Sequence, residues 1–223
     1  MRVWDLDPGY LNRQILLGEH LEIHAIANNR KGYAHRPETL RWKQHRGALC
    51  RRHDLGVAEM GLRGYSHRSP ALKTGSDLWP STFLESPGRQ FRILAEKYRG
   101  RKGPHGRIPL PVNAGQLWAQ HKYSVLARDP ERYRELGRRV SRMRKGAELD
   151  DLAAELVGIL REAPTPGRLR NAVDHLWGYV SGLEADSGNP TIAEIAARAM
   201  RHRVEYVLHS TALGDLGYWA SMV

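Results

Sequence analysis

Apolar residues recur along this chain at helical spacing, and the pattern predicts helices almost throughout. Near the start, one side of a helix drawn at 100° per residue would carry Leu11, Ile15, Gly18, Glu22 and Ile26. Asp7 can cap this helix, and Pro8 suits its first turn. A carboxylate and a glycine within such a stripe are unusual, because burial disfavours the charge and glycine weakens a helix.

Further helices are predicted from Pro37 onward and over residues 48–62, 114–128, 130–145, 148–163, 168–182 and 192–209. Gly64 fits a helix C-cap, while Asn113 and Asp129 fit helix N-caps. Residues 66–90 are rich in loop-forming residues. Because no alternating run of Val, Ile and Thr reaches strand length, the sequence predicts an all-α fold.

Residues 99–113 are dense in arginine, lysine, glycine and proline, a composition typical of a linker. We therefore expect a compact helical module over 1–98, a basic linker over 99–113 and a second helical module over 114–223. The chain of 223 residues is long enough for two such modules.

Composition narrows the class of protein. Apolar residues make up 41% of the chain, which supports a hydrophobic core. The single cysteine, Cys50, excludes a disulfide framework and a cysteine zinc site. Since no apolar run resembles a signal peptide or reaches the length of a membrane span, we expect a cytoplasmic, nucleoid-associated protein without a membrane partner.

The net charge of +11 points to an anionic partner, and its uneven distribution favours double-stranded DNA. Residues 30–73 carry eleven Lys/Arg against three acidic residues, and residues 89–107 carry seven against one. The expected phosphate contacts are Arg30, Lys31, Arg36, Arg41, Lys43, Arg46, Arg51, Arg52, Arg63 and Arg68. Three aromatic residues lie among them and could stack on bases, although Trp42 suits a core position equally: Tyr33, Trp42 and Tyr65.

The start of the chain supplies the candidate chemistry. An α-amine has a pKa of about 7.7–8.0 against about 10.4 for lysine, so far more of it is an unprotonated nucleophile near pH 7. Met1 is expected to provide this amine, Arg2 to lower its pKa further, and Trp4 to anchor it in the fold. Glu22 would then stabilise developing positive charge and move protons, with Glu19 as a substitute. The alternative is a structural ion pair between Glu22 and an arginine.

Two segments, residues 1–22 and 47–65, carry a resemblance to the pyrimidine dimer DNA glycosylase family. The first runs from Met1-Arg2-Val3-Trp4 to Gly18-Glu19-His20-Leu21-Glu22, and the second is a basic helix that ends in Gly64-Tyr65. The resemblance implies an all-helical fold with N-glycosylase and abasic-site lyase activity. It also implies that the N-terminal amine is the nucleophile, that an arginine follows it, and that a glutamate on the first helix is catalytic; by position these catalytic residues are Met1, Arg2 and Glu22. Met1 is expected to stay, because the bulky Arg2 disfavours methionine removal. Leu21 and Ala25 stand where the founding enzyme has basic residues, and 217–219 only faintly resemble its aromatic tail.

The second half resembles an uncharacterised module found fused to bacterial thiouracil desulfidases. The matching residues are 121–123, 133–137, Asn171 and 175–179. From these, His121, Lys122, Asn171 and His175 form a candidate second polar site. The alternative is that they serve only helix capping and packing.

Three other functions remain open at this level. His20 and His24 are four residues apart on one helical face, the spacing of metal ligands, with His35, His53 or His121 as a third ligand of a metal-dependent enzyme. A non-catalytic nucleic-acid-binding protein would show the same charge pattern, and the second half suggests RNA or modified-nucleotide processing. The main interpretation, a DNA repair glycosylase and lyase, needs no cofactor or metal, and we expect a monomer.

Overall fold

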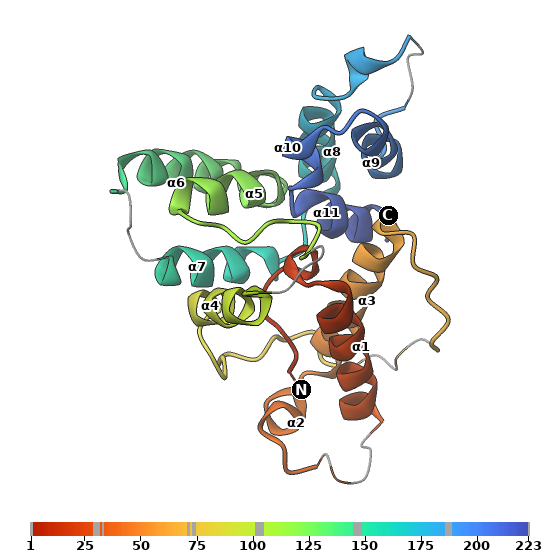
Figure 1. Cartoon of the computed structure of the whole chain (residues 1–223), viewed down its shortest axis with the longest axis vertical. Helices are drawn as coiled ribbons and strands as arrows, with labels where there is room; N and C mark the ends of the chain where they lie inside the picture. The colour runs from red at the N-terminus through yellow and green to blue at the C-terminus, as the bar shows by residue number, and fades with distance from the viewer. Residues whose placement is uncertain are drawn as a thin grey trace.

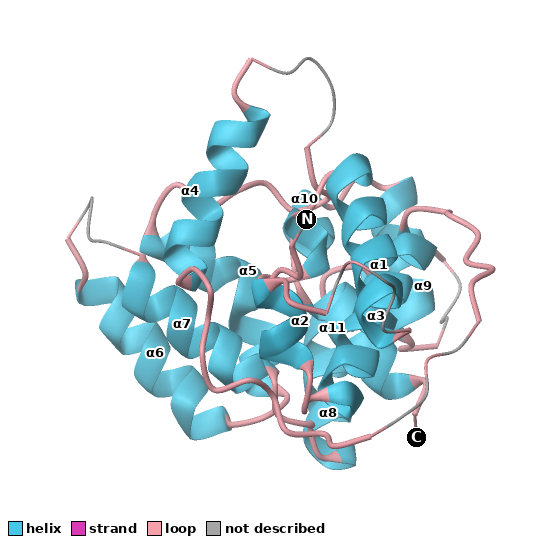
Figure 2. Cartoon of the chain, turned by 90° about the horizontal axis from the view of Figure 1, so that it is seen from below, coloured by secondary structure: helices cyan, strands magenta, loops and turns pink. Residues whose placement is uncertain are grey.

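The structure is a computed structural model that describes residues 2–28, 32, 34–70, 72, 75–100, 105–144, 149–185 and 189–222. Its α-helices are α1 (Arg13–Ala27), α2 (Pro37–Trp42), α3 (Arg46–Leu62), α4 (Pro87–Tyr98), α5 (Ala114–Leu126), α6 (Pro130–Arg142), α7 (Asp150–Leu160), α8 (Pro166–Trp177), α9 (Ile192–Arg201), α10 (Glu205–Leu208) and α11 (Ala212–Ala220). Two 3₁₀ turns, η1 (Pro8–Tyr10) and η2 (Ser181–Leu183), complete the set. These residues contain no strand, which confirms the all-α prediction (Figure 2). None of their helices combines the length and apolar composition that crossing a bilayer requires.

Local capping chemistry accounts for several helix ends. The Asn113 side chain accepts the Gln116 N–H and begins α5, and the Asp129 side chain begins α6 in the same way. Gly64 has a φ of +72° and ends α3, as its sequence position predicts. The predicted role of Asp7 is wrong, because its side chain caps η1 whereas Asn12 caps α1.

Three other helix predictions are corrected. The loop-rich stretch 66–90 includes the first residues of α4, which Ser86 caps and Pro87 opens. The predicted helix over 192–209 is divided into α9 and α10 by Arg203, whose φ is +53°. The final helix, α11, was not predicted, since its two glycines and short length gave little periodic signal.

The helices pack so that distant parts of the sequence share one core. In Figure 1, α1 and α3 lie together, α4 lies beside α7, and α11 comes back from the C-terminal end to pack on α3. One hydrophobic cluster accordingly joins Trp4 and Leu16 near the start of the chain to Leu117 and Leu156 in its second half. Burial of this shared surface holds the N-terminal segment in place.

Part of the expected linker is tightly packed. Ile108 is fully buried, and its N–H donates to Gly9 O at 2.9 Å. The Arg107 guanidinium forms an ion pair with Glu59 at 2.7 Å and also donates to Ser210 O. Residues 105–113 therefore join the two halves of the chain, while the domain boundary itself stays a prediction.

Candidate functional site

The extended start of the chain is held by side chains from three helices. Its backbone N–H groups donate in succession: Val3 to Glu38 Oε1 at 3.2 Å, Trp4 to Glu19 Oε1 at 2.6 Å, and Asp5 to Gln90 Oε1 at 2.9 Å. Val3 and Trp4 are buried, so their N–H groups need such acceptors in place of water. Contacts with α2, α1 and α4 thus fix the path of the backbone over residues 3–5. Met1 itself lies outside the described residues.

Two buried carboxylates lie one turn apart on α1 and differ in their surroundings. Glu19 accepts two hydrogen bonds from Arg52, at 3.0 and 2.8 Å, in addition to the Trp4 N–H. Glu22 is 1% exposed, and its Oε2 has no hydrogen-bond partner within the described part of the chain. Glu19 is therefore held in an ion pair with Arg52, whereas Oε2 of Glu22 is not used in any hydrogen bond of the described residues.

Burial raises the pKa of Glu22 above its ordinary value, while the positive charges of the N-terminal ammonium and of Arg36 act in the opposite direction. Burial also raises the pKa of Glu19, against the lowering effect of Arg52. A carboxyl group whose pKa is raised exchanges a proton more readily near neutral pH. Glu22 is therefore chemically suited to act as an acid or base.

A hollow of about 420 Å³ lies beside the anchored N-terminal segment. Its lining residues come from the N-terminal segment, α1 and α4: Arg2, Trp4, Ile15, Gly18, Glu19, Ile93 and Lys97. Gly18 leaves open space here, because a Cβ built on it would meet nothing within 4 Å in the described structure. Arg52 compensates the charge of Glu19, and the cations of the lining are Lys97 and Arg2, which forms an ion pair with Glu85 at 3.8 Å. Lys97 was not predicted from the sequence, because only the packing of α4 brings it to the same hollow as α1.

The basic residues expected to bind DNA differ in their exposure. Arg36, Lys43 and Arg68 are exposed and accessible to an anionic partner. Arg46 and Arg51 are partly buried, and Arg51 contacts Asp77 at 3.6 Å. Arg30 and Lys31, like the aromatic Tyr33, lie outside the described residues.

Three of the expected DNA contacts instead bind internal acceptors. Arg41 forms an ion pair with Asp5, with its side chain 3% exposed, and Arg52 pairs with Glu19. Arg63 pairs with Glu59 at 2.7 Å and also donates to the Leu11 carbonyl. These guanidiniums satisfy buried carboxylates and loop carbonyls, so they have little capacity left for phosphates. Trp42 is 2% exposed and donates to Glu38, which makes it a core residue.

The candidate second polar site is not gathered at one place. His121 is buried beside Tyr10, and its Nδ1 lies 2.9 Å from Leu117 O. Burial lowers the pKa of His121 to about 4. Lys122 instead lies over the Tyr123 ring, which also stacks on the exposed His175 at 6.2 Å, and Asn171 is exposed one turn from His175 on α8. The structure therefore separates His121 from the other three.

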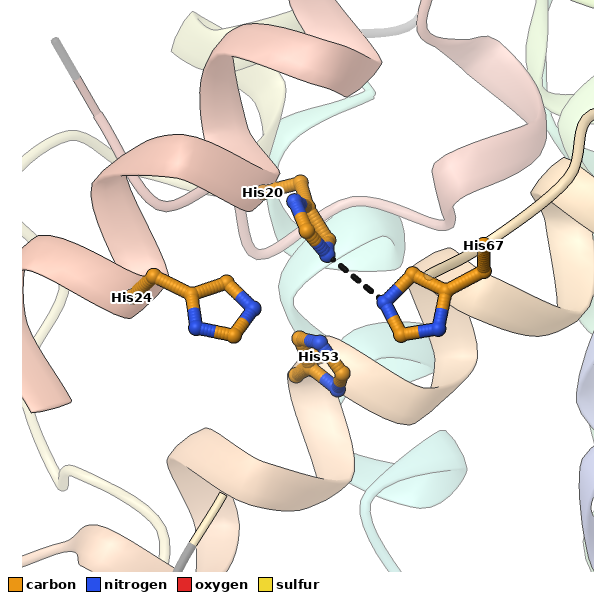
Figure 3. Close-up of side chains that lie close together, drawn as sticks. All are labelled: His20, His24, His53 and His67. Atoms are coloured by element: carbon orange, nitrogen blue, oxygen red, sulfur yellow. Dashed lines mark hydrogen bonds between the residues drawn. The ribbon is translucent and has the colours of Figure 1, made fainter. Parts of the chain in front are cut away.

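A cluster of four histidines lies on the α1–α3 interface. His20 and His24 on α1 approach His53 on α3 and His67 in the segment that follows α3 (Figure 3). One nitrogen from each ring lies within 4.8 Å of the other three. Burial, followed by the charges of the neighbouring histidines, lowers the pKa of His20 to about 4, so its imidazole is neutral at pH 7.

The cluster settles which histidines join His20 and His24. His53, one of the three expected third ligands, is part of it, and His67 was not predicted. His35 is exposed and His121 lies in the interior beside Tyr10, so neither belongs to this group. The spacing of histidines along α1 was a usable signal, whereas the approach of His67 depends on the turn after α3.

Comparison with known protein families gives two matches. Residues 1–73 match the family model described as pyrimidine dimer DNA glycosylase. Residues 122–213 match the family model described as protein of unknown function (DUF1722). These matches confirm the two-part resemblance, and the first suggests a DNA repair glycosylase. Searches of curated proteins and of solved structures gave no match.

Proposed function

We propose, from the similarity of its N-terminal third to pyrimidine dimer DNA glycosylases, that this chain is a DNA glycosylase with abasic-site lyase activity. Its nucleophile would be the α-amine of Met1, and its acid–base group Glu22. The observation that carries the proposal is a buried carboxylate with an uncommitted oxygen, on the helix that anchors the start of the chain.

The amine lone pair would form a bond to C1′ of the target nucleotide as the bond from C1′ to the base breaks. The base leaves with the bonding electrons and takes up a proton, and the sugar ring then opens to give an imine between the amine and C1′. Removal of a 2′ proton next expels the 3′ phosphate by β-elimination. Each step moves a proton, which is the work that a carboxyl group with a raised pKa can perform.

The environment of Glu22 supports this role. In a site with little water, a carboxylate stabilises the positive charge that develops on the sugar more strongly than it would in solution. The hollow lined by Arg2, Gly18 and Lys97 supports binding of a nucleotide on the adjacent face of α1, where the two cations would contact phosphates.

We propose double-stranded DNA as the substrate, bound through the exposed cations Arg36, Lys43 and Arg68. A target base must leave the duplex to reach a protein group, at a cost of a few kcal/mol. Phosphate contacts offset this cost, and Tyr65, which is partly exposed, is a candidate for stacking on a displaced base.

Borohydride trapping on duplex DNA with one abasic site tests the proposal. An adduct on the N-terminal peptide, located by mass spectrometry, identifies the nucleophile and shows whether Met1 begins the mature chain. Strand cleavage should be lost in Glu22→Gln and retained in Glu131→Gln, an exposed control on α6. Salt-dependent DNA binding without an adduct would refute the Schiff-base mechanism and favour a non-catalytic binding protein.

A further inference from the structure

We propose that His20, His24, His53 and His67 form a binding site for one divalent transition-metal ion, with zinc as the representative metal. The site is separate from the amine–carboxylate pair, and the proposed glycosylase activity does not require it. Imidazole nitrogen suits zinc, copper, nickel and iron, whereas magnesium and calcium prefer oxygen ligands.

The spacing of the four rings fits a small ion. His20 Nε2 lies 3.0 Å from His67 Nε2, and all four ligand nitrogens lie within 4.8 Å of one another. A tetrahedral zinc ion with bonds of about 2.0–2.1 Å needs nitrogens about 3.3 Å apart. Figure 3 shows the His24 and His53 rings facing the His20–His67 pair, and side-chain rotation would bring their nitrogens to this distance.

Two ring nitrogens of the cluster lack a hydrogen-bond partner in the part of the chain that the structure describes, and a bound metal ion would provide one for each. In the described residues, neither His24 Nε2 nor His53 Nε2 has a hydrogen-bond partner, although both atoms are buried. Buried polar atoms nearly always have a partner, so two unpaired nitrogens in one cluster point to a missing ligand.

One residue outside the cluster prepares it for metal binding. His53 Nδ1 lies 2.8 Å from Asp54 Oδ1, and a carboxylate can only accept, so Nδ1 carries the proton. In its neutral form the ring then presents the lone pair of Nε2 to the cluster. A carboxylate that orients a histidine in this way is the usual second partner of a metal-bound imidazole.

The turn that follows α3 places the fourth ligand, His67, beside the other three histidines. Gly64 ends α3 with a positive φ, and the Tyr65 N–H donates to Met60 O at 2.9 Å, which redirects the chain. His67 then lies beside His53 of α3 and His20 of α1. Four protein ligands would fill a tetrahedral ion, so the site is structural, and it would join α1 to α3.

The test measures metal content and affinity in the full chain without a polyhistidine tag. We expect about one ion per chain by elemental analysis, and a rise in melting temperature when zinc is added after chelation. Cobalt should bind in its place and produce the visible absorption bands of a tetrahedral nitrogen site.

Three variants make the test specific. Asp54→Asn keeps all four ligands and should weaken zinc binding by roughly 10- to 100-fold. His67→Gln, at a partly exposed position, should weaken it by more than that, while the exposed control His35→Gln should have no effect. The proposal is overturned if the wild-type chain neither contains nor binds zinc, or if the His67 and His35 variants bind it equally. Because no DNA enters these measurements, their failure is distinct from failure of the proposed glycosylase activity.

Discussion

Glu19→Gln and Glu22→Gln make the same chemical change one helical turn apart, and the structure predicts opposite results. In Glu19→Gln the Arg52 guanidinium, whose side chain is 4% exposed, would lose the carboxylate that balances its charge. Leaving one member of a buried ion pair uncompensated costs about 3–5 kcal/mol. For a chain of 223 residues, each kcal/mol lowers the melting temperature by about 2–4 °C, so we expect a fall of roughly 6–20 °C.

Glu22→Gln should not lower the melting temperature. Burial raises the pKa of Glu22, which means that the folded chain disfavours the ionised carboxylate relative to the unfolded chain. Above that raised pKa, removal of the charge should leave stability unchanged or increase it slightly. Cleavage of abasic DNA should nevertheless be lost, because the neutral amide neither accepts the proton nor stabilises positive charge.

The assay combines thermal unfolding at pH 7.5 with strand cleavage at a temperature where all variants are folded. Glu131→Gln provides the matched control, and it should behave as wild type in both measurements. If Glu22→Gln loses as much stability as Glu19→Gln, Glu22 is a member of a structural ion pair and the assignment of roles on α1 is wrong.

Further variants test other parts of the structure. Gly18→Ala should raise the melting temperature by about 2–4 °C, because alanine favours a helix by about 1 kcal/mol over glycine and the site is open; destabilisation would show that the space is filled. Replacing Arg36, Lys43 and Arg68 together by Gln should reduce the salt dependence of DNA binding by about three counterions in fluorescence anisotropy, and an unchanged slope would exclude them as phosphate contacts. Burial raises the pKa of Asp7 from 3.8 to about 7, so its contribution to stability is fully present below pH 3.8 and is lost as the pH rises through 7. In denaturant titrations between pH 4 and 8, Asp7→Asn should flatten that decline, whereas an unaltered pH profile would contradict the raised pKa.

Local chemistry made much of the fold predictable. Caps such as Asn113 and Asp129 act over three residues, so the sequence contains both partners of each interaction. The choice between Asp7 and Asn12 as the start of α1 was not predictable in this way. Both are good caps, and the packing of Gly9 and Tyr10 against distant residues decides that the chain first forms a separate 3₁₀ turn.

The sequence alone determined the all-helical class, the basic character and the presence of a carboxylate on the apolar side of the first helix, because periodicity and charge are local properties. Tertiary structure decided which carboxylate has an arginine partner, since Glu19 and Arg52 lie 33 positions apart and meet only when α3 packs on α1. Other tertiary contacts pair Arg41 with Asp5 across 36 positions, direct Arg63 to the Leu11 carbonyl, and bring His67 to His20 across 47 positions. Contacts between residues this far apart depend on the angle and position at which two helices pack. The periodicity of a single helix does not determine which residues of its neighbour it will contact.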